Sequence, residues 1–552
     1  MVEFALRNAR VVDGTRAPAR SADVLVRDGV IVEVGPLPET HGRQDIDLSG
    51  LVLSPGFVDP HTHYDAQVFW DRDLTPSSWH GVTTAVMGNC GFGVAPTRPE
   101  HREIVLRTLE RVEGMPIEAL RLGLPWVFET YPEYLDAVDA LPKRVHVASL
   151  IGHTPIRHFV MGDAATEREA TIEEIRDMRA VVEGALEAGA VGLSTSKSPT
   201  HRGAGNKPVP SRLAAIDEIV GLALALRGAG YGVLEATYGP GLFVEEFADL
   251  ARRTGRPVTW AAVLAQRADP SWARSIVART RELGGDVFPQ MACRPVVFQL
   301  RLDDPTSLSG LESFKELREL DDAERRARYA DAAWRTQARA DIAADSLWAG
   351  RFEDAVVEES CAHGALVGGP TLGELAAERG THAFDVAVLL SLEDDLATRF
   401  RVILANDDED QVARLLLEDG LMLGLSDAGA HTSQLCDANA PTYLLGYWMR
   451  ERGVLSLEDA VWRLSGQPAE VFGLRDRGVI RRGAVADLVA FDPATVGSRG
   501  PERVRDLPGG ADRVIVRSIG VEHVWVGGTC VRRDGVDLDG VAPGRLLRNG
   551  AG

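Results

Sequence analysis

The sequence of 552 residues contains little cysteine, few aromatic residues and very little lysine. Its five cysteines are scattered and never form a CxxC pair, which excludes a disulfide framework and a structural zinc ribbon. Lysine supplies only four of the 60 basic residues, at positions 143, 197, 207 and 315. Acidic residues number 81, so the net charge is −21, which argues against nucleic acid or an anionic membrane surface as a partner.

Long hydrophobic runs are also missing. No stretch approaches 18 apolar residues, and the start MVEFALRNARVVDG lacks the apolar core of a signal peptide. We therefore expect a cytoplasmic protein with a small-molecule substrate and no membrane partner. The motifs GxSxG, GxxxxGK[ST], HExxH and GxGxxG are absent, which excludes the site classes that they mark.

The two ends of the chain resemble each other and differ from its middle. Short β-rich runs with Asp-Gly and Gly-Pro turns occupy the first fifty residues, and similar runs occupy the last seventy-five. They predict one β-sandwich domain from residues 1–55 and 477–552. The predicted strands are 4–12, 22–26, 30–34, 485–491, 513–516 and 521–526.

Residues 56–476 alternate short apolar strands with helical segments, a pattern typical of βαβ units and a parallel sheet. Eight strands are expected, the number that closes a (β/α)8 TIM-like barrel. They are 56–60, 83–87, 145–151, 190–194, 232–236, 257–263, 286–290 and 421–425. Residues 299–400, with helix expected over 317–344, predict a helical insertion before the last barrel strand, as a lid or wall of the site.

The sharpest local signal is GFVDPHTH at residues 56–63. The alternation of side chains along a strand points His61 and His63 to the same side, which in a barrel is the interior at the catalytic mouth. Two same-facing imidazoles are a metal-ligand arrangement, although an isolated HxH also occurs by chance on solvated loops.

A second signal is GLSDAGAH at residues 424–431, after the expected last strand. Asp427 at a strand tip can complete the coordination of a metal ion and accept a proton from its bound water. The plainer alternative is that Asp427 caps the next helix.

Together, His61, His63, Asp427 and the β-rich termini resemble the metal-dependent amidohydrolase superfamily. Other motifs are similar to its D-aminoacylase (N-acyl-D-amino-acid deacylase) branch. They are GNCG at 88–91, IGH at 151–153 with Arg157, GLST at 192–195, GVI at 478–480 and GAVADLV at 483–489.

The resemblance implies a zinc-dependent hydrolase in which metal-bound hydroxide attacks a carbonyl carbon. Asp427 would act first as general base and then as general acid toward the leaving nitrogen, and His61 and His63 would hold the ion. A divalent ion lowers the pKa of its bound water from 15.7 to about 7 and polarises the carbonyl. His153 either steadies the substrate carbonyl as a catalytic residue or is a buried structural histidine. The candidate substrate-binding residues are Arg157, His201 and His431.

Two departures from the deacylase pattern bear on the metal and the substrate. The deacylases carry a metal-binding histidine after the fifth strand and another after the sixth, and this chain has neither at 232–238 or 257–263. We therefore expect one divalent ion, with Glu235 either replacing a ligand or lining the site. Residues 259–264 and 432–443 also lack the basic side chains with which deacylases hold the amino-acid carboxylate.

Cys90 and Lys197 compete for one role. The resemblance carries a metal-ligand cysteine onto Cys90, whereas other amidohydrolases use a carboxylated lysine after the fourth strand, where Lys197 stands. An anionic thiolate or carbamate is favoured beside a dication in either case. Lys197 can instead bind an anionic substrate group together with the glycine-rich segment 200–207, or both residues can be structural.

The sequence thus predicts an α/β protein that hydrolyses an amide, a cyclic amide or an N-acyl amino acid. It is expected to use one divalent metal ion, zinc, held by His61, His63 and Asp427. Hydrolysis of a lactone or other ester at the same site is one alternative. A binding barrel with reduced catalysis is another, suggested by the two missing histidines. A homodimer is expected from similar enzymes.

Overall fold

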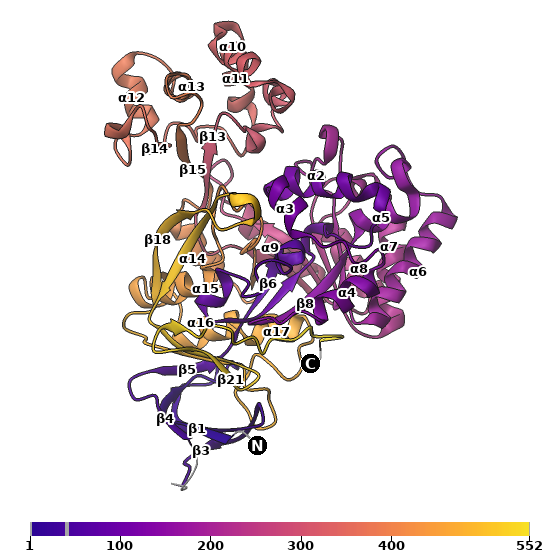
Figure 1. Ribbon diagram of the computed structural model, residues 1–552, viewed down its shortest axis with the longest axis vertical. Helices are drawn as coiled ribbons and strands as arrows, with labels where there is room; N and C mark the ends of the chain where they lie inside the picture. Colours follow the sequence, from indigo (N-terminus) through magenta and orange to yellow (C-terminus); the bar gives the residue numbers. More distant parts are fainter. Residues whose placement is uncertain (1–2, 39–43, 551–552) are drawn as a thin grey trace.

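The computed structural model describes residues 3–38 and 44–550. Eight parallel strands form the central sheet, each pairing with the next along the chain (Figure 1). They are β6 (Phe57–Thr62), β7 (Val82–Met87), β8 (His146–Gly152), β9 (Gly192–Ser196), β10 (Val233–Thr237), β11 (Val258–Val263), β12 (Val287–Met291) and β16 (Met422–Leu423). All eight predicted strands are confirmed.

The sheet curls so that its first strand meets the segment after its last. Thr62 bridges Ala428, and the backbone N–H of His63 donates to the Ala428 carbonyl at 2.7 Å. These bonds bring the two predicted motifs together at the carboxyl ends of the strands, where sites lie in TIM-like barrels.

Helices cover the outside of the curled sheet. Strands β6 and β7 are buried along their whole length, as expected for parallel strands covered on both faces. The longest of the helices, α6, begins with a capping box at Thr171 and ends at Gly189. The α-helices of the barrel are α1 (Tyr64–Gln67), α2 (Arg102–Glu113), α3 (Ile117–Gly123), α4 (Tyr131–Asp139), α5 (His153–Met161), α6 (Ile172–Ala188), α7 (Ile216–Ala229), α8 (Val244–Thr254), α9 (Trp272–Leu283), α14 (Glu409–Leu416), α15 (Ala440–Tyr443), α16 (Leu457–Leu464) and α17 (Gly466–Val471).

Both termini build a second sheet at one end of the molecule (Figure 1). Its strands are β1 (Glu3–Val11), β2 (Arg20–Arg27), β3 (Val30–Gly35), β4 (Gln44–Asp47), β5 (Val52–Pro55), β17 (Leu488–Phe491), β20 (Val521–Val526), β21 (Thr529–Arg533) and β22 (Val536–Asp537). Antiparallel pairing of β5 with β17 joins the two chain ends, and Leu53, Leu488 and Trp525 share one hydrophobic core. The domain boundaries at 55/56 and 476/477 stay a prediction.

The strand expected at 513–516 is confirmed, but it lies outside this sheet. It forms β19 (Arg513–Ile519), which pairs with β18 (Gly497–Val504). The Val514 N–H donates to the Thr432 carbonyl at 2.7 Å, and the Arg513 guanidinium bonds Thr75. These contacts hold the hairpin against the segment that follows the last barrel strand.

The insertion stands at the end of the molecule opposite the terminal sheet (Figure 1). Helices are not its only elements, because β13 (Val296–Arg301), β14 (Val356–Glu359) and β15 (Arg399–Ala405) form a sheet. The helix expected at 317–344 is interrupted, since Asp331 takes an extended conformation and caps the second helix. The helices are α10 (Asp322–Ala330), α11 (Ala332–Ala344), α12 (Leu372–Arg379) and α13 (Ala383–Glu393).

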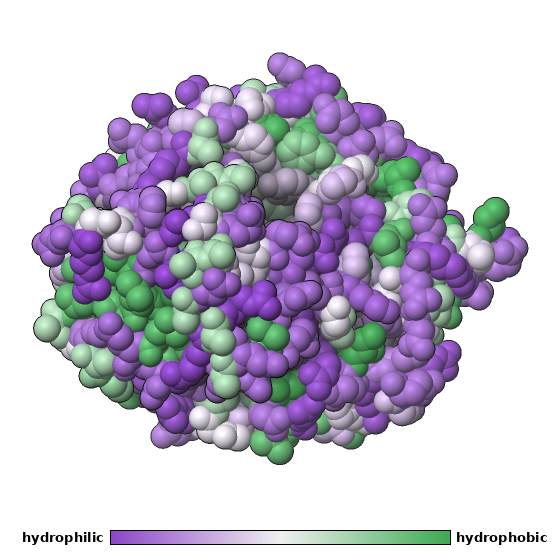
Figure 2. Space-filling model, turned by 90° about the horizontal axis from the view of Figure 1, so that it is seen from above, coloured by the Kyte–Doolittle hydropathy of each residue, from purple (hydrophilic) through white to green (hydrophobic). Residues whose placement is uncertain are grey.

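The surface is largely hydrophilic. Figure 2 shows polar residues over most of one face, with smaller hydrophobic groups between them. Within residues 3–38 and 44–550, no helix has both the length and the apolar character needed to cross a membrane.

Candidate metal centre

His61 and His63 stand at the end of β6 with both side chains buried. The Nδ1 atom of His61 lies 2.7 Å from Oε1 of Gln290, whose amide nitrogen donates to Thr259 at 3.0 Å. Because the Thr259 hydroxyl donates onward to the Phe288 carbonyl at 2.8 Å, it accepts from the amide, and the amide oxygen faces His61. Nδ1 of His61 therefore carries the proton, which leaves the lone pair of Nε2 free for a metal ion.

Cys90 and Asp427 approach the same ring atom from distant parts of the chain. Nε2 of His61 lies 3.3 Å from the Cys90 sulfur and 3.2 Å from Oδ1 of Asp427. The same Asp427 oxygen lies 3.7 Å from Nε2 of His63. Cys90 (φ 57°) and Asp427 (φ 45°) both adopt left-handed backbone, which costs about 1–3 kcal/mol each and is typical of functional sites.

The spacing of these atoms fits a bound metal ion. Ligand atoms of His61, His63 and Cys90 all lie within 4.8 Å of one another. A tetrahedral zinc ion with bonds of about 2.0–2.3 Å separates its ligand atoms by about 3.3–3.7 Å. Of the observed separations, 3.3 and 3.7 Å fall within this range, and the 3.2 Å between His61 and Asp427 lies just below it. His61 and His63 are thus a metal-site candidate, as the sequence predicted.

Two more buried carboxylates face the histidines. Oε2 of Glu113, at the end of α2, lies 3.5 Å from Nε2 of His63, and the Glu113 carbonyl accepts from the His431 N–H. Glu235, on β10, accepts the Cys90 N–H at 2.7 Å, while its Oε1 has no hydrogen-bond partner and lies 4.0 Å from Nδ1 of His61. An unpaired buried carboxylate oxygen at this place is what a cation would satisfy.

Electrostatics at the site is dominated by burial and by excess negative charge. Burial raises the pKa of Glu113 to about 7 and that of Glu235 to about 8. Burial opposes a charge on His63, but Glu113 and Asp427 outweigh it and raise the pKa of His63 to about 9. Burial lowers the pKa of His61 to about 4. Despite burial, the two imidazoles hold the pKa of Asp427 below its usual range.

Sequence reasoning did not find Glu113, Gln290 or Asp59. Asp59 supports the Asp427 loop, because the Ser426 hydroxyl lies 2.8 Å from both of its oxygens, and burial raises the pKa of Asp59 to about 7. Gln290 ends a predicted strand, so the polar residue at that strand tip was an available signal. Glu113 lies on a helix, and nothing in the local sequence marks it.

His153 and Arg157 belong to a separate buried cluster. The ring nitrogens of His153 bond Thr195 and Glu218, both at 2.8 Å. The fully buried guanidinium of Arg157 pairs with Glu218 at 2.5 Å. The structure therefore gives His153 the surroundings of a structural histidine, and it gives Arg157 a carboxylate partner from the protein itself. Their predicted contacts with substrate receive no support from this geometry.

Lys197 also lies apart from the His61, His63 and Cys90 group. Its ammonium donates to the carbonyls of Arg212 and Ala214 at 2.6 and 2.7 Å. A carbamate there would face the same carbonyl oxygens, so the geometry favours Cys90 over Lys197 as the anionic ligand. His201 bonds Ser196 at 2.7 Å, and burial lowers the pKa of His201 to about 3.

His431 and the insertion meet beside Asp427. Burial lowers the pKa of His431 while Asp427 opposes this effect, and the ring of His431 packs 5.7 Å from that of Phe298 on β13. The Gln299 N–H donates to the Gln434 carbonyl at 2.9 Å. These contacts fit the prediction that the insertion walls the site.

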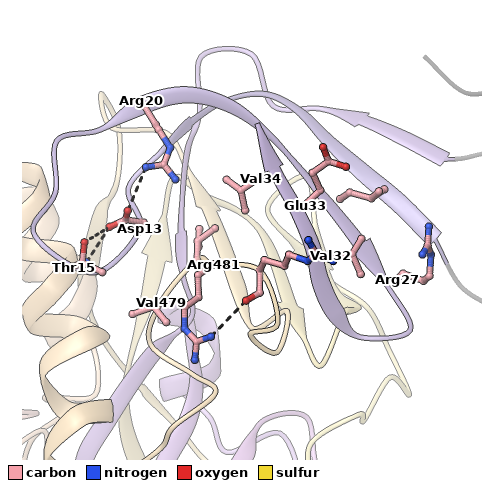
Figure 3. Close-up of a pocket in the computed structure, with 12 residues that line it drawn as sticks. Asp13, Thr15, Arg20, Arg27, Val32, Glu33, Val34, Val479 and Arg481 are labelled. Atoms are coloured by element: carbon pink, nitrogen blue, oxygen red, sulfur yellow. Dashed lines mark hydrogen bonds and ion pairs between the residues drawn. The ribbon is translucent and has the colours of Figure 1, made fainter. Parts of the chain in front are cut away.

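Cavity size alone does not locate this centre. A cavity of about 860 Å³ lies in the terminal sheet (Figure 3), and its Asp13 is already paired with Thr15 and Arg20. A cavity of only about 20 Å³ is lined by Asp427. We assign the site from its chemistry, because convergent buried ligands identify a metal centre and an open hollow between paired groups does not.

Comparison with known proteins agrees with this assignment. Residues 44–532 match the Amidohydrolase family. The chain is 30% identical to D-aminoacylase of Alcaligenes xylosoxydans xylosoxydans, with 99% of this chain and 97% of the relative covered. A solved structure of D-aminoacylase, described with a binuclear metal centre, superposes with a TM-score of 0.68 at 29% identity and 99% coverage of each chain.

A second solved structure adds a bound metal. N-acyl-D-glutamate deacylase of Bordetella bronchiseptica, in complex with zinc and a phosphonate inhibitor, superposes with a TM-score of 0.65 at 27% identity, again with 99% of each chain covered. The chain studied here belongs to the amidohydrolase family and is a D-aminoacylase-like hydrolase of carbon–nitrogen bonds other than peptide bonds.

Proposed function

We propose that the protein hydrolyses a non-peptide C–N bond with one zinc ion held by His61, His63, Cys90 and Asp427, and with Asp427 also acting as general base and acid. The observation that carries the proposal is the convergence of His61, His63 and Cys90 within 4.8 Å, with Asp427 3.2 Å from His61. The zinc in the related N-acyl-D-glutamate deacylase supports the choice of metal.

Each residue has a distinct task. His61 presents Nε2 because Gln290 binds its Nδ1 proton. Zinc, when bound, supplies Lewis acidity that activates water and polarises the acyl carbonyl. Asp427 stays ionised at neutral pH, so its carboxylate accepts the proton of the attacking water. The Asp427 carboxyl group then returns the proton to the leaving nitrogen.

One metal is favoured over two because neutral ligands for a second ion are missing. Glu235 and Thr259 stand at the strands that in deacylases lead to metal-binding histidines. Thr259 already bonds Gln290, and Glu235 is held by the Cys90 N–H. The D-aminoacylase relative, described with a binuclear centre, thus differs from the arrangement proposed for this chain.

Metal analysis with a hydrolysis assay tests the proposal. We expect about one zinc per purified chain, loss of N-acyl amide hydrolysis on chelation, and recovery when zinc is restored. Two tightly held ions per chain would contradict the single-metal arrangement. Full activity of a metal-free chain would contradict the proposed function itself.

A further inference from the structure

We propose that this site takes acyl compounds whose leaving nitrogen carries no carboxylate: N-acyl amines, N-acyl amino-acid amides and cyclic imides. The inference rests on the proposed function and narrows it to a substrate class. It departs from the N-acyl amino acids that the names of its relatives indicate.

The first argument is the charge of the site. Asp427, Glu113 and Glu235 place three buried carboxylates around His61 and His63. These carboxylates come from three separate parts of the chain, and the acid groups of the site outnumber the two charges that one divalent ion would supply.

The second argument is that two neighbouring arginines are already paired with carboxylates of the protein. Arg513, which lines the small cavity with Asp427, bonds both oxygens of Asp506 at 2.8 Å. Arg294 pairs with Asp437 at 2.9 Å and donates to the Cys436 carbonyl at 2.6 Å. Lys197 donates to two backbone carbonyls at 2.6 and 2.7 Å.

A substrate carboxylate therefore meets two arginines that already hold carboxylates, and it meets buried acid groups of its own sign. Recognition of a carboxylate normally uses a free arginine fork or an ammonium group. Like charges at close range disfavour binding and are a common device for rejecting the wrong ligand. Removing the carboxylate removes that repulsion without altering the scissile bond.

A matched pair of substrates provides the test. N-acetyl-D-leucinamide and N-acetyl-D-leucine differ only in the carboxyl group, and both are assayed with zinc-loaded enzyme. We expect kcat/KM for the amide to exceed that for the acid at least about tenfold. Faster hydrolysis of the acid would overturn the substrate class and leave the proposed function intact.

Equilibrium binding separates a failure of the proposed substrate class from a failure of the proposed hydrolytic function. N-methanesulfonyl-D-leucinamide and N-methanesulfonyl-D-leucine keep the same charges but resist hydrolysis, so calorimetry measures recognition alone. Tighter binding of the sulfonamide amide supports the inference, and tighter binding of the acid overturns it. Failure of zinc-loaded enzyme to hydrolyse the scissile amides and imides would overturn the proposed function. The substrate class would still be decided by which of the two sulfonamides binds more tightly.

A charge variant sharpens the result. Glu113→Gln removes one buried carboxyl group. We expect the ratio of the affinity for N-methanesulfonyl-D-leucine to that for N-methanesulfonyl-D-leucinamide to rise about fivefold or more in protein with confirmed zinc content. Glu118→Gln removes the same charge from an exposed position that pairs with Arg121, and we expect it to leave the ratio nearly unchanged. Equal shifts in the two variants would show that Glu113 does not set the preference.

Discussion

Two clusters of buried histidine and carboxylate lie at the carboxyl ends of barrel strands, one after β6 and one after β8, and they differ in charge balance. In one, the single carboxylate of Glu218 is shared by His153 and Arg157. In the other, His61 and His63 face Asp427, Glu113 and Glu235, and one Glu235 oxygen has no hydrogen-bond partner.

The difference separates a structural cluster from a binding cluster. Burying charge is costly unless partners compensate it, and Arg157 provides that compensation within the protein. Around His61 and His63, carboxylates outnumber the cationic side chains. A bound cation would compensate them, and in the metal-free protein protons on Glu113 and Glu235 take its place. Charge balance therefore identifies the site better than the presence of histidine.

Substitution of a ligand should give the largest contrast. His61→Ala is expected to lose bound zinc and to reduce hydrolysis at least about a thousandfold, because the ion contributes several kcal/mol to the transition state. His153→Ala is the matched control, and we expect it to keep stoichiometric zinc. Zinc content by elemental analysis checks both variants. Stoichiometric zinc in His61→Ala would break the comparison.

Breaking the cluster of His153, Arg157 and Glu218 should instead lower the free energy of unfolding. Arg157→Met leaves Glu218 without its buried cation, and we expect the free energy of unfolding to fall by about 3–5 kcal/mol. Arg179→Met removes a half-exposed partner of Glu183 and should cost about 0–1 kcal/mol. Urea denaturation of zinc-loaded protein measures both. Loss of zinc from folded Arg157→Met would show that the clusters are not independent.

The hydrogen bond to His61 should have a smaller effect. Gln290→Leu removes the acceptor that orients the ring, and we expect zinc affinity to fall about 10–100-fold. Competition with a chelator of known affinity measures the change. Gln337→Leu, which alters an exposed glutamine on α11, serves as control. An unchanged affinity in Gln290→Leu would mean that the ring needs no such support.

The smallest expected effect is the pH dependence of the metal-free protein. In the folded state the pKa of Glu235 is about 8 and that of His63 about 9, both above their ordinary values of 4.5 and 6.5. Between pH 6.5 and 8 Glu235 and His63 bind more protons in the folded than in the unfolded chain, so their contribution to stability falls as pH rises. His63 contributes stability fully below pH 6.5 and loses it as pH rises through about 9.

Thermal melts of chelator-treated protein at pH 6.5 and 8 check this sign. The melting temperature should fall by a few degrees, and Glu235→Gln should reduce the fall. Zinc-loaded protein should change less over the same interval, because zinc holds its ligands deprotonated. The same pH response in the metal-free wild type and in metal-free Glu235→Gln would contradict the proposed excess of buried acid.

Much of the barrel could be predicted because its signals are local. Buried parallel strands appear as apolar runs, and all eight were found. The pairing of His61 with His63 could also be predicted, because side chains two residues apart on one strand point to the same side. The strand at 513–516 was also found, but its place was not. It pairs with β18 outside the terminal sheet and contacts Thr432 and Thr75, and no local pattern reveals these partners.

The sequence by itself determined the family, the barrel and the paired histidines of this protein, since each is written in short motifs or strand periodicity. Only the tertiary structure decided which charges meet. Glu113, Glu235 and Asp427 come from separate parts of the chain, as do Glu218 and its partners His153 and Arg157. Charge compensation in a buried site acts over a few ångströms in space, irrespective of separation along the chain, and it distinguishes the metal centre from its structural neighbour.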